Sequence, residues 1–314
     1  MQICIRRISH RGKNAKMPAL VLSDGTSLHY EDWGQGTPIL LVHGFGMTGE
    51  SFFKQRILRN QFRIIVPDLR GWGKSTSSHS SSAQKPNTIK TMGDDVFELI
   101  SHLELDKIVY VGWSMGAMVF WEAAKSHSLS NISHMIAVDM SPKVLNSTDW
   151  QYGLIGSVGL ETKKGKARAK RAISEMLTNW AATSKRIIRK IFASNSFQND
   201  RAKLSADIET LLSISNSNSG ENAAQCWQSL IECDCSEIVK SINIPTSIVQ
   251  GLGSQLYAND VCVAVCKSMP NCKLYSFQFS GHAPHVEQPN EFNQLVETIA
   301  NSVKTKAIEP ILIV

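Results

Sequence analysis

The sequence predicts an α/β fold with a mostly parallel central sheet, helices on its flanks and a helical cap inserted into the chain. Short apolar strands alternate with segments whose apolar residues recur at helical spacing, and this alternation is typical of βαβ units with right-handed crossovers. Between residues 143 and 238 the alternation stops, and several helical segments follow one another without a convincing buried strand. It resumes over residues 239–304, so we predict one large α/β core interrupted by a cap.

The composition is that of an ordinary globular protein, with 42% hydrophobic and 19% charged residues over a chain of 314 residues that can bury a large core. The net charge is a modest +6, and the basic residues gather at 6–16 and 163–190 without closely interleaved aromatic residues. This pattern argues against a nucleic-acid partner. No apolar run approaches the roughly 20 residues that a membrane span requires.

The seven cysteines match no zinc-binding spacing, so we expect reduced thiols in a cytoplasmic protein without a metal. Residues 1–16 carry several Lys and Arg residues and no acid, which faintly resembles a mitochondrial presequence. A disordered basic arm is the favoured interpretation of this segment. The apolar tail at residues 305–314 has no assigned role.

The first part of the core is predicted at residues 17–142. Asp24-Gly25 is a typical turn of a β-hairpin, and the apolar run at 39–42 is typical of a strand buried on both faces. Strands are predicted at residues 17–22, 27–32, 39–42, 62–66, 108–113 and 135–140. Helices are predicted at residues 50–59 and 92–105 and directly after Ser114.

The cap and the second part of the core follow in the same way. Within the cap, helices are predicted at residues 163–180, 184–192 and 204–212, before a polar Ser/Asn run at 213–219. The second part of the core is predicted to contribute strands at residues 245–251 and 273–279 and helices at residues 260–269 and 290–303.

Ser114 lies in the pattern Gly112-x-Ser114-x-Gly116, between the apolar strand at 108–113 and a helical run. This is the pattern of a nucleophile elbow, in which a serine occupies a sharp turn from strand to helix and glycines let the backbone approach closely. Three fixed positions occur by chance in many chains, but the strand–turn–helix context favours a reactive serine.

Four motifs, in this chain order, resemble those of the α/β-hydrolase family. They are HGFG at 43–46, DLRGWGKS at 68–75, the elbow at 112–116 and SGHAPHVEQP at 280–289. The chain is most similar to the small cofactor-free serine esterases and to the non-haem haloperoxidase-like (perhydrolase) branch. The resemblance implies the α/β-hydrolase fold, a Ser-His-acid triad and no cofactor.

His282 is the predicted general base. A serine hydroxyl is a weak nucleophile that needs a base within hydrogen-bonding reach, and histidine suits that role near neutral pH. His282 follows a strand and a glycine, at a loop expected to reach the sheet edge where Ser114 lies. His285 is the nearby competitor, but the family motif places the base at His282.

The acid is predicted to be Asp139. The family commonly has G-x-x-D after the strand at 245–251, and here Ser254 stands where the aspartate is expected. Asp139 ends the preceding strand and is directed to the same sheet edge, and some family members carry the acid there. Asp260 is the alternative, although its place at the start of a helix is typical of an N-cap. Ser254 would then contact the His282–Asp139 pair.

The resemblance further implies an oxyanion hole made by the backbone N–H groups of Phe45 and Met115. Trp113, which adjoins the serine, and Ser254 are predicted to contact the substrate. Core packing alone would equally account for most of the aromatic residues here and in the cap.

We predict a serine hydrolase that cleaves carboxylic esters with a small or medium apolar acyl group through an acyl-enzyme. We expect the protein to bind a small-molecule ester, to have no nucleic-acid partner and to lack a membrane span. The sequence leaves its oligomeric state open. The same triad could serve a lactonase, thioesterase, C–C hydrolase or perhydrolase. Two further alternatives are a slow-turnover ligand receptor and an inactive scaffold, the latter suggested only by the missing G-x-x-D aspartate.

Overall fold

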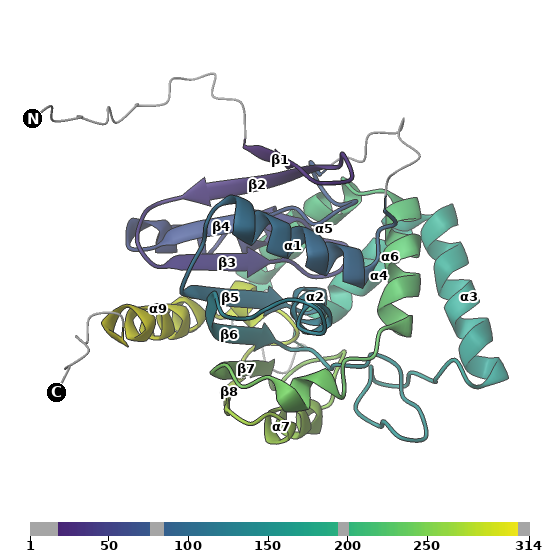
Figure 1. Cartoon of the computed structure of the whole chain (residues 1–314). Coiled ribbons are helices and arrows are strands. Elements are labelled where there is room, and N and C mark those ends of the chain that lie inside the picture. Colours follow the sequence, from purple (N-terminus) through teal and green to yellow (C-terminus); the bar gives the residue numbers. More distant parts are fainter. Residues whose placement is uncertain (1–17, 76–84, 194–200, 307–314) are drawn as a thin grey trace, which may run out of the picture.

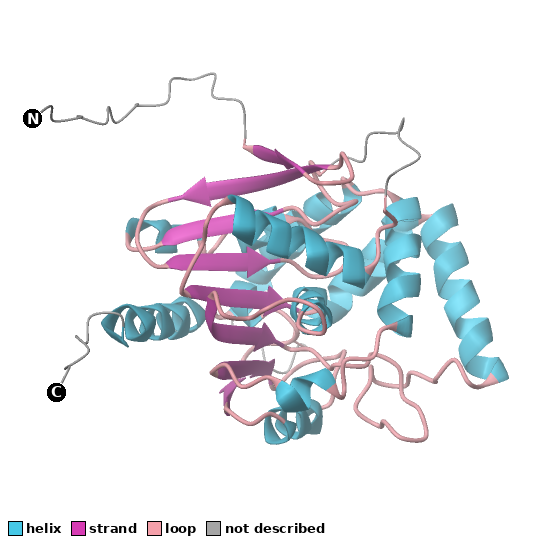
Figure 2. Cartoon of the chain, viewed as in Figure 1, coloured by secondary structure: helices cyan, strands magenta, loops and turns pink. Residues whose placement is uncertain are grey.

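The structure, a computed structural model, describes residues 18–75, 85–193 and 201–306 (Figure 1). The predicted basic arm at residues 1–16 and residues 307–314 of the predicted tail lie outside this part of the chain. Helices cover both faces of a central sheet, and a second group of helices lies beyond the sheet edge at which β3 and β5 end (Figure 2).

Within the described part of the chain, eight strands form one sheet in the order β1-β2-β4-β3-β5-β6-β7-β8. β1 pairs antiparallel with β2, and β2 pairs antiparallel with β4, whereas every pairing from β4 to β8 is parallel. The predicted mostly parallel sheet is therefore confirmed. The strands are β1 Ala19–Val21, β2 Ser27–Trp33, β3 Pro38–Val42, β4 Arg63–Pro67, β5 Ile108–Trp113, β6 Ile132–Val138, β7 Thr246–Gly251 and β8 Cys272–Phe277.

Among the residues that the structure describes, one α-helix separates successive strands from β4 to β8, except that four lie between β6 and β7, and two more follow β8. The helices are α1 Ile89–His102, α2 Met115–Ala123, α3 Lys163–Thr178, α4 Trp180–Ile191, α5 Arg201–Asn216, α6 Gly220–Glu232, α7 Asn259–Ser268, α8 Pro284–Glu287 and α9 Pro289–Lys306. None of the helices in the described ranges is long and apolar enough to cross a membrane.

β3 shows why the central strands carry apolar residues at every position. Leu40 and Val42 belong to the core cluster formed with α1, α2 and α7, whereas Ile39 and Leu41 belong to the cluster formed with α9. Successive side chains of a strand point to opposite faces, so a strand covered on both faces needs apolar residues throughout. The apolar pattern of the strand thus places it in the centre of the sheet.

In the chain, helices α3 to α6 follow β6 and precede β7, where the sequence predicts the cap. α3 packs against α6, and α4 packs against α5. α3 ends and α4 begins at Asn179, whose side chain accepts a hydrogen bond from the Ala182 N–H and so caps α4. The cap boundaries at residues 143 and 238 stay a prediction.

Two helix predictions need correction. The single helix predicted at 50–59 is replaced by two short 3₁₀ helices, Gly49–Phe52 and Arg56–Asn60. Between them Gln55 turns inward and donates from Nε2 to the His285 carbonyl (2.8 Å) and to Asn293 Oδ1 (3.0 Å), which interrupts a continuous helix. The second correction is α6, which was not predicted and begins at the capping residue Ser219.

The expectation of fully reduced cysteines is also wrong. Cys266 at the end of α7 and Cys272 at the start of β8 form a disulfide, with 5.4 Å between their Cα atoms. The short connection between helix and strand brings these two residues together. Among the described cysteines, Cys226, Cys233, Cys235 and Cys262 are outside any disulfide.

Candidate active site

Ser114 occupies a strained turn between the buried strand β5 and helix α2. Its φ of 51° and ψ of −120° lie in a region that residues other than glycine rarely adopt. A Cβ atom on Gly116 would lie 2.2 Å from the Val42 carbonyl oxygen, and one on Gly112 would lie 2.5 Å from the Ala117 nitrogen. Both glycines of the predicted motif are therefore required by close backbone packing.

The structure brings Asp139 and His282 together at the ends of β6 and β8. His282 Nδ1 lies 2.7 Å from Asp139 Oδ2, and both side chains are almost fully buried. The Ser254 hydroxyl donates to the same Asp139 oxygen at 2.8 Å. Asp260, the alternative acid, is exposed in the first turn of α7.

The main chain around His282 is held by several hydrogen bonds. Its N–H donates to the Ile191 carbonyl at the end of α4 (2.6 Å), and its carbonyl accepts from Trp113 Nε1 (2.8 Å). The Trp113 ring lines the same cavity as Ser114, and its centroid is 5.9 Å from that of His282. Trp113, at the end of β5, therefore links the strand before Ser114 to the loop that carries His282. The sequence did not indicate this contact.

The Ser114 hydroxyl and the His282 ring line one cavity. In this structure the hydroxyl donates to Met140 Sδ at 3.9 Å, and the Tyr257 hydroxyl donates to the same sulfur at 3.2 Å. Hydrogen bonds between a nucleophile and its base are often loose without substrate.

The loop that carries Phe45 is fixed by a buried histidine. His43 Nε2 accepts from the Leu69 N–H (3.0 Å), so the ring proton lies on Nδ1, which donates to the Gly44 carbonyl (2.9 Å). Burial lowers the pKa of His43, which favours the neutral ring, and the two hydrogen bonds select this tautomer. His43 thus stabilises the loop and is not placed to act as a second base.

The two predicted oxyanion donors flank the serine. Met115 is the first residue of α2, so its N–H has no acceptor within the helix. Among the described residues, the Phe45 N–H also has no hydrogen-bond acceptor, and Phe45 lines the cavity beside Ser114. The positive end of α2 adds to the preference for negative charge at this point.

The cavity has a volume of about 310 Å³ and lies between the sheet edge and the cap. This is near the lower end of the range for small-molecule sites, roughly 300–1,000 Å³. Its lining includes apolar residues of the core and cap, among them Val144, Leu154, Met176, Ile187, Leu230 and Leu256. Lys190 of α4 brings positive charge to the same cavity, whereas Arg186 of α4 forms an ion pair with Glu175, which also lines the cavity, at 2.5 Å. Ser254 is absent from this lining and contacts Asp139 instead.

His285 does not compete with His282. It lies outside the cavity lining and is packed 4.5 Å from the Trp113 ring and 5.1 Å from the Phe52 ring, between centroids. Burial, together with the nearby His282 and Lys54, lowers the pKa of His285 to about 3. The ring is therefore a neutral packing group.

Glu287 is a functional neighbour that the sequence analysis missed. Its carboxylate accepts from the Gly281 N–H at 2.7 Å and from the Ala193 N–H at 2.8 Å, so it ties the histidine loop to the chain that leaves α4. Burial raises the pKa of Glu287 to about 7, and the two backbone N–H groups oppose this rise. The Glu at the end of the SGHAPHVE motif was the available signal.

Asp68 and Arg70 of the DLRGWGKS motif have structural contacts. Asp68 accepts from the backbone N–H groups of Gly49 (2.8 Å) and Lys74 (2.9 Å). Arg70 is buried and forms ion pairs with Asp24 and Asp95, each at 2.6 Å. Neither residue lines the cavity.

An eight-stranded, mostly parallel sheet with a serine elbow after β5 defines a class of protein, and the sequence comparison agrees with it. Residues 37–289 match the family described as alpha/beta hydrolase fold, and the chain belongs to that family. The predicted family and fold are thus confirmed.

Individual relatives are distant but cover almost the whole chain. The chain is similar to the non-heme chloroperoxidase CPO-A1 of Kitasatospora aureofaciens, with 24% identity over 85% of this chain and 92% of the relative. It is also similar to the pimeloyl-[acyl-carrier protein] methyl ester esterase of Vibrio campbellii, with 25% identity over 85% of this chain and 96% of the relative. These names agree with the predicted esterase and haloperoxidase-like branch.

Solved structures of other proteins share the fold of this chain. The esterase EaEST from Exiguobacterium antarcticum superposes with a TM-score of 0.78 and 22% identity, over 90% of this chain and 98% of that one. At this identity the likeness establishes the fold alone.

Proposed function

We propose that the protein is a serine carboxylesterase with Ser114 as nucleophile, His282 as general base and Asp139 as the acid of the triad. The observation that carries this proposal is the buried contact of 2.7 Å between His282 Nδ1 and Asp139 Oδ2, at a cavity that also contains the elbow serine. A carboxylate at Nδ1 holds the proton there and leaves the Nε2 lone pair for the serine.

The reaction proceeds through an acyl-enzyme. His282 accepts the proton of Ser114 as the hydroxyl oxygen attacks the ester carbonyl, and the backbone N–H groups of Phe45 and Met115 stabilise the oxyanion. Each such donor contributes roughly 3 kcal/mol in related sites. His282 then protonates the leaving alcohol and activates a water molecule that releases the acid.

The proposed substrate is a small-molecule ester with a small or medium apolar acyl group. The cavity of about 310 Å³ and its largely apolar walls support this size and chemistry. Ester hydrolysis also fits the printed name of the Vibrio campbellii relative, a methyl ester esterase. We further propose that the protein acts without a nucleic-acid partner.

Perhydrolysis is the second candidate, because one relative is named a non-heme chloroperoxidase. In that reaction hydrogen peroxide replaces water as the nucleophile that attacks the acyl-enzyme and gives a peracid. The two candidates share every step up to the acyl-enzyme, so they are separated by the product and not by the triad.

A serine-directed fluorophosphonate and a chain-length series of nitrophenyl esters test the proposal. Labelling and turnover are expected in the wild type, with both lost in Ser114→Ala and turnover strongly reduced in Asp139→Asn. Asp260→Asn is the matched control and should resemble the wild type. Absence of labelling in the folded wild-type protein would refute an activated serine.

A further inference from the structure

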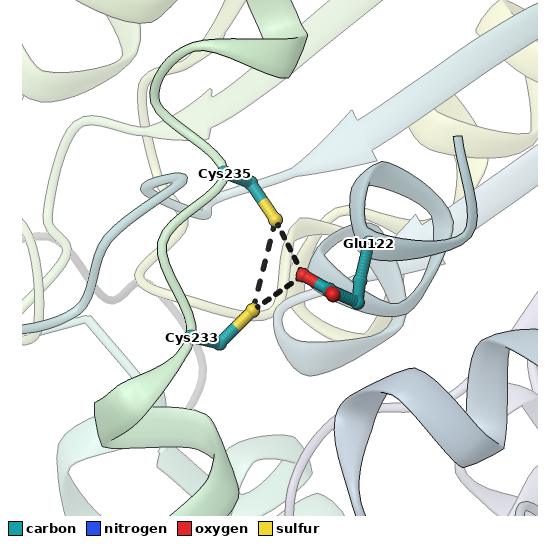
Figure 3. Close-up of side chains that lie close together, drawn as sticks. All are labelled: Glu122, Cys233 and Cys235. Carbon is teal, nitrogen blue, oxygen red and sulfur yellow. Dashed lines mark hydrogen bonds between the residues drawn. The ribbon is translucent and has the colours of Figure 1, made fainter. Parts of the chain in front are cut away.

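A cluster of two thiols and a carboxylate lies at the end of α2 opposite to Ser114. Glu122 is in the last turn of α2, while Cys233 and Cys235 follow α6 on the segment that leaves the cap. Figure 3 shows both sulfur atoms and the Glu122 carboxylate pointing toward one another. We propose that these three residues bind a divalent transition-metal ion, with Zn²⁺ as the best fit.

The local backbone explains why both cysteines point the same way. Cys233 has an extended conformation, and Asp234 forms an antiparallel β-bridge with Lys143. In extended chain, residues two apart point to the same side, so Cys233 and Cys235 share one face and Asp234 takes the other. There the Asp234 carboxylate pairs with Lys143 Nζ at 3.1 Å.

The three donor atoms already have the spacing of a tetrahedral metal site. The two sulfur atoms are 3.6 Å apart, and Glu122 Oε2 lies 3.1 Å from Cys233 Sγ and 3.4 Å from Cys235 Sγ. Tetrahedral Zn–S bonds of about 2.3 Å and Zn–O bonds of about 2.0 Å would place these atoms about 3.8 Å and about 3.5 Å apart. Shifts of a few tenths of an ångström therefore suffice to admit the ion.

The fourth coordination position is available to water. Cys235 is buried, but Cys233 and Glu122 are only partly buried, so one side of the donor triangle faces solvent. Two thiolates and one carboxylate favour Zn²⁺ over Mg²⁺ or Ca²⁺, which prefer sets of oxygen ligands. The sequence expectation of no metal rested on spacing along the chain, and Glu122 is more than a hundred residues from either cysteine.

Charge balance supports the same assignment. In this structure both thiols donate to Glu122 Oε2, so a divalent ion would take the place of two thiol protons, which leave to solvent. Two thiolates, one carboxylate and the ion together carry one negative charge. Lys125 Nζ, 2.5 Å from the same Glu122 oxygen, balances it. A second lone pair of that oxygen keeps the contact with Lys125, as partners of metal ligands commonly do.

Cobalt binding tests the site directly in the full-length protein with the Cys266–Cys272 disulfide intact and Cys233 and Cys235 as thiols. One equivalent of Co²⁺ is expected to produce the near-ultraviolet absorption of thiolate-to-cobalt charge transfer, and Zn²⁺ should displace it. Cys233→Ser and Cys235→Ser should each abolish the absorption. Lys125→Met should weaken binding by about 10- to 100-fold, as loss of a partner of a metal ligand does. Cys262→Ala, which removes a buried thiol of α7, is the matched control and should bind normally.

Two results would overturn the metal site. One is absence of the absorption in wild-type protein with the Cys266–Cys272 disulfide intact, and the other is its persistence in Cys233→Ser under the same conditions. If either cysteine variant fails to fold, Glu122→Gln gives the same decision, because loss of the carboxylate must weaken Co²⁺ binding by at least tenfold. Fluorophosphonate labelling of Ser114 is measured on the same samples, so loss of the metal site is distinguished from failure of the proposed esterase.

Discussion

Replacing Asp139 by Asn tests the proposed triad most directly, because the two residues have the same shape. Asp139 Oδ2 accepts from both His282 Nδ1 (2.7 Å) and the Ser254 hydroxyl (2.8 Å). If the amide oxygen of Asn takes that position, both hydrogen bonds remain and only the negative charge is lost. If the amide nitrogen takes it, His282 must accept at Nδ1, and its proton moves to Nε2, where it cannot act as a base.

These two cases bracket the expected loss of activity. A hydrogen bond to a charged group contributes about 1.5–3 kcal/mol, so loss of the charge alone lowers kcat by roughly 10- to 150-fold. The wrong tautomer costs about 10⁴-fold, or about 5 kcal/mol, in the best-known serine triad. We expect kcat of Asp139→Asn to fall by between about 10-fold and about 10⁴-fold, with KM little changed.

Steady-state hydrolysis of nitrophenyl butyrate gives the measurement, with folding checked by circular dichroism. Ser254→Ala removes the other donor to Asp139 and should lower kcat by less than about 30-fold, since one neutral donor contributes about 1–2 kcal/mol. The double variant should lose less than the product of the single losses, because both changes act on one carboxylate. An Asp139→Asn enzyme within threefold of the wild type would refute the reasoning.

Three further predictions concern residues around the triad. Burial raises the pKa of Glu287 from 4.5 to about 7, so between these pH values the native state binds more protons than the unfolded chain. The contribution of Glu287 to the free energy of unfolding therefore falls as pH rises from 4.5 through 7, by at most about 3 kcal/mol. Urea denaturation as a function of pH should show a smaller slope for Glu287→Gln than for the wild type. Trp113→Phe leaves the buried His282 carbonyl without its donor and should lower stability by about 1–3 kcal/mol. In ester assays kcat of this variant should fall by roughly tenfold. An unchanged thermal midpoint would contradict the predicted loss of stability. Lys190→Met should raise KM for esters with a terminal carboxylate by up to about fivefold and leave KM for the butyrate ester unchanged, whereas Lys185→Met, outside the cavity lining, should change neither.

The parts of the site that the sequence indicates are those set by local chain geometry. The elbow at Ser114 needs glycines two residues before and after it, and the histidine loop is a contiguous motif, so both are visible in a few residues. The proposal of Asp139 as the acid needed more than a local motif, because Ser254 stands where the family usually has an aspartate. Its identification depended on which strand ends share one sheet edge, and this follows from the alternation of strands and helices.

Features created by packing between distant segments could not be predicted in this way. The helix expected at 50–59 is broken because Gln55 turns inward to groups contributed by the C-terminal region. α6 was missed because it follows a polar Ser/Asn run that is typical of a loop. The approach of Cys233 and Cys235 to Glu122 depends on how the end of the cap meets α2, which no spacing along the chain expresses.

The hydrogen bond from the His282 N–H to the Ile191 carbonyl has a kinetic consequence. Ile191 ends α4 and also lines the cavity, so a bound molecule that pushes this helix outward must pull on the loop that carries His282, the proposed general base. An oversized ester would therefore bind and yet react slowly, because its own bulk misaligns the proton acceptor. We expect such an enzyme to discriminate between small and large esters through kcat more than through KM, because the position of the last turn of α4 depends on the size of the bound ester.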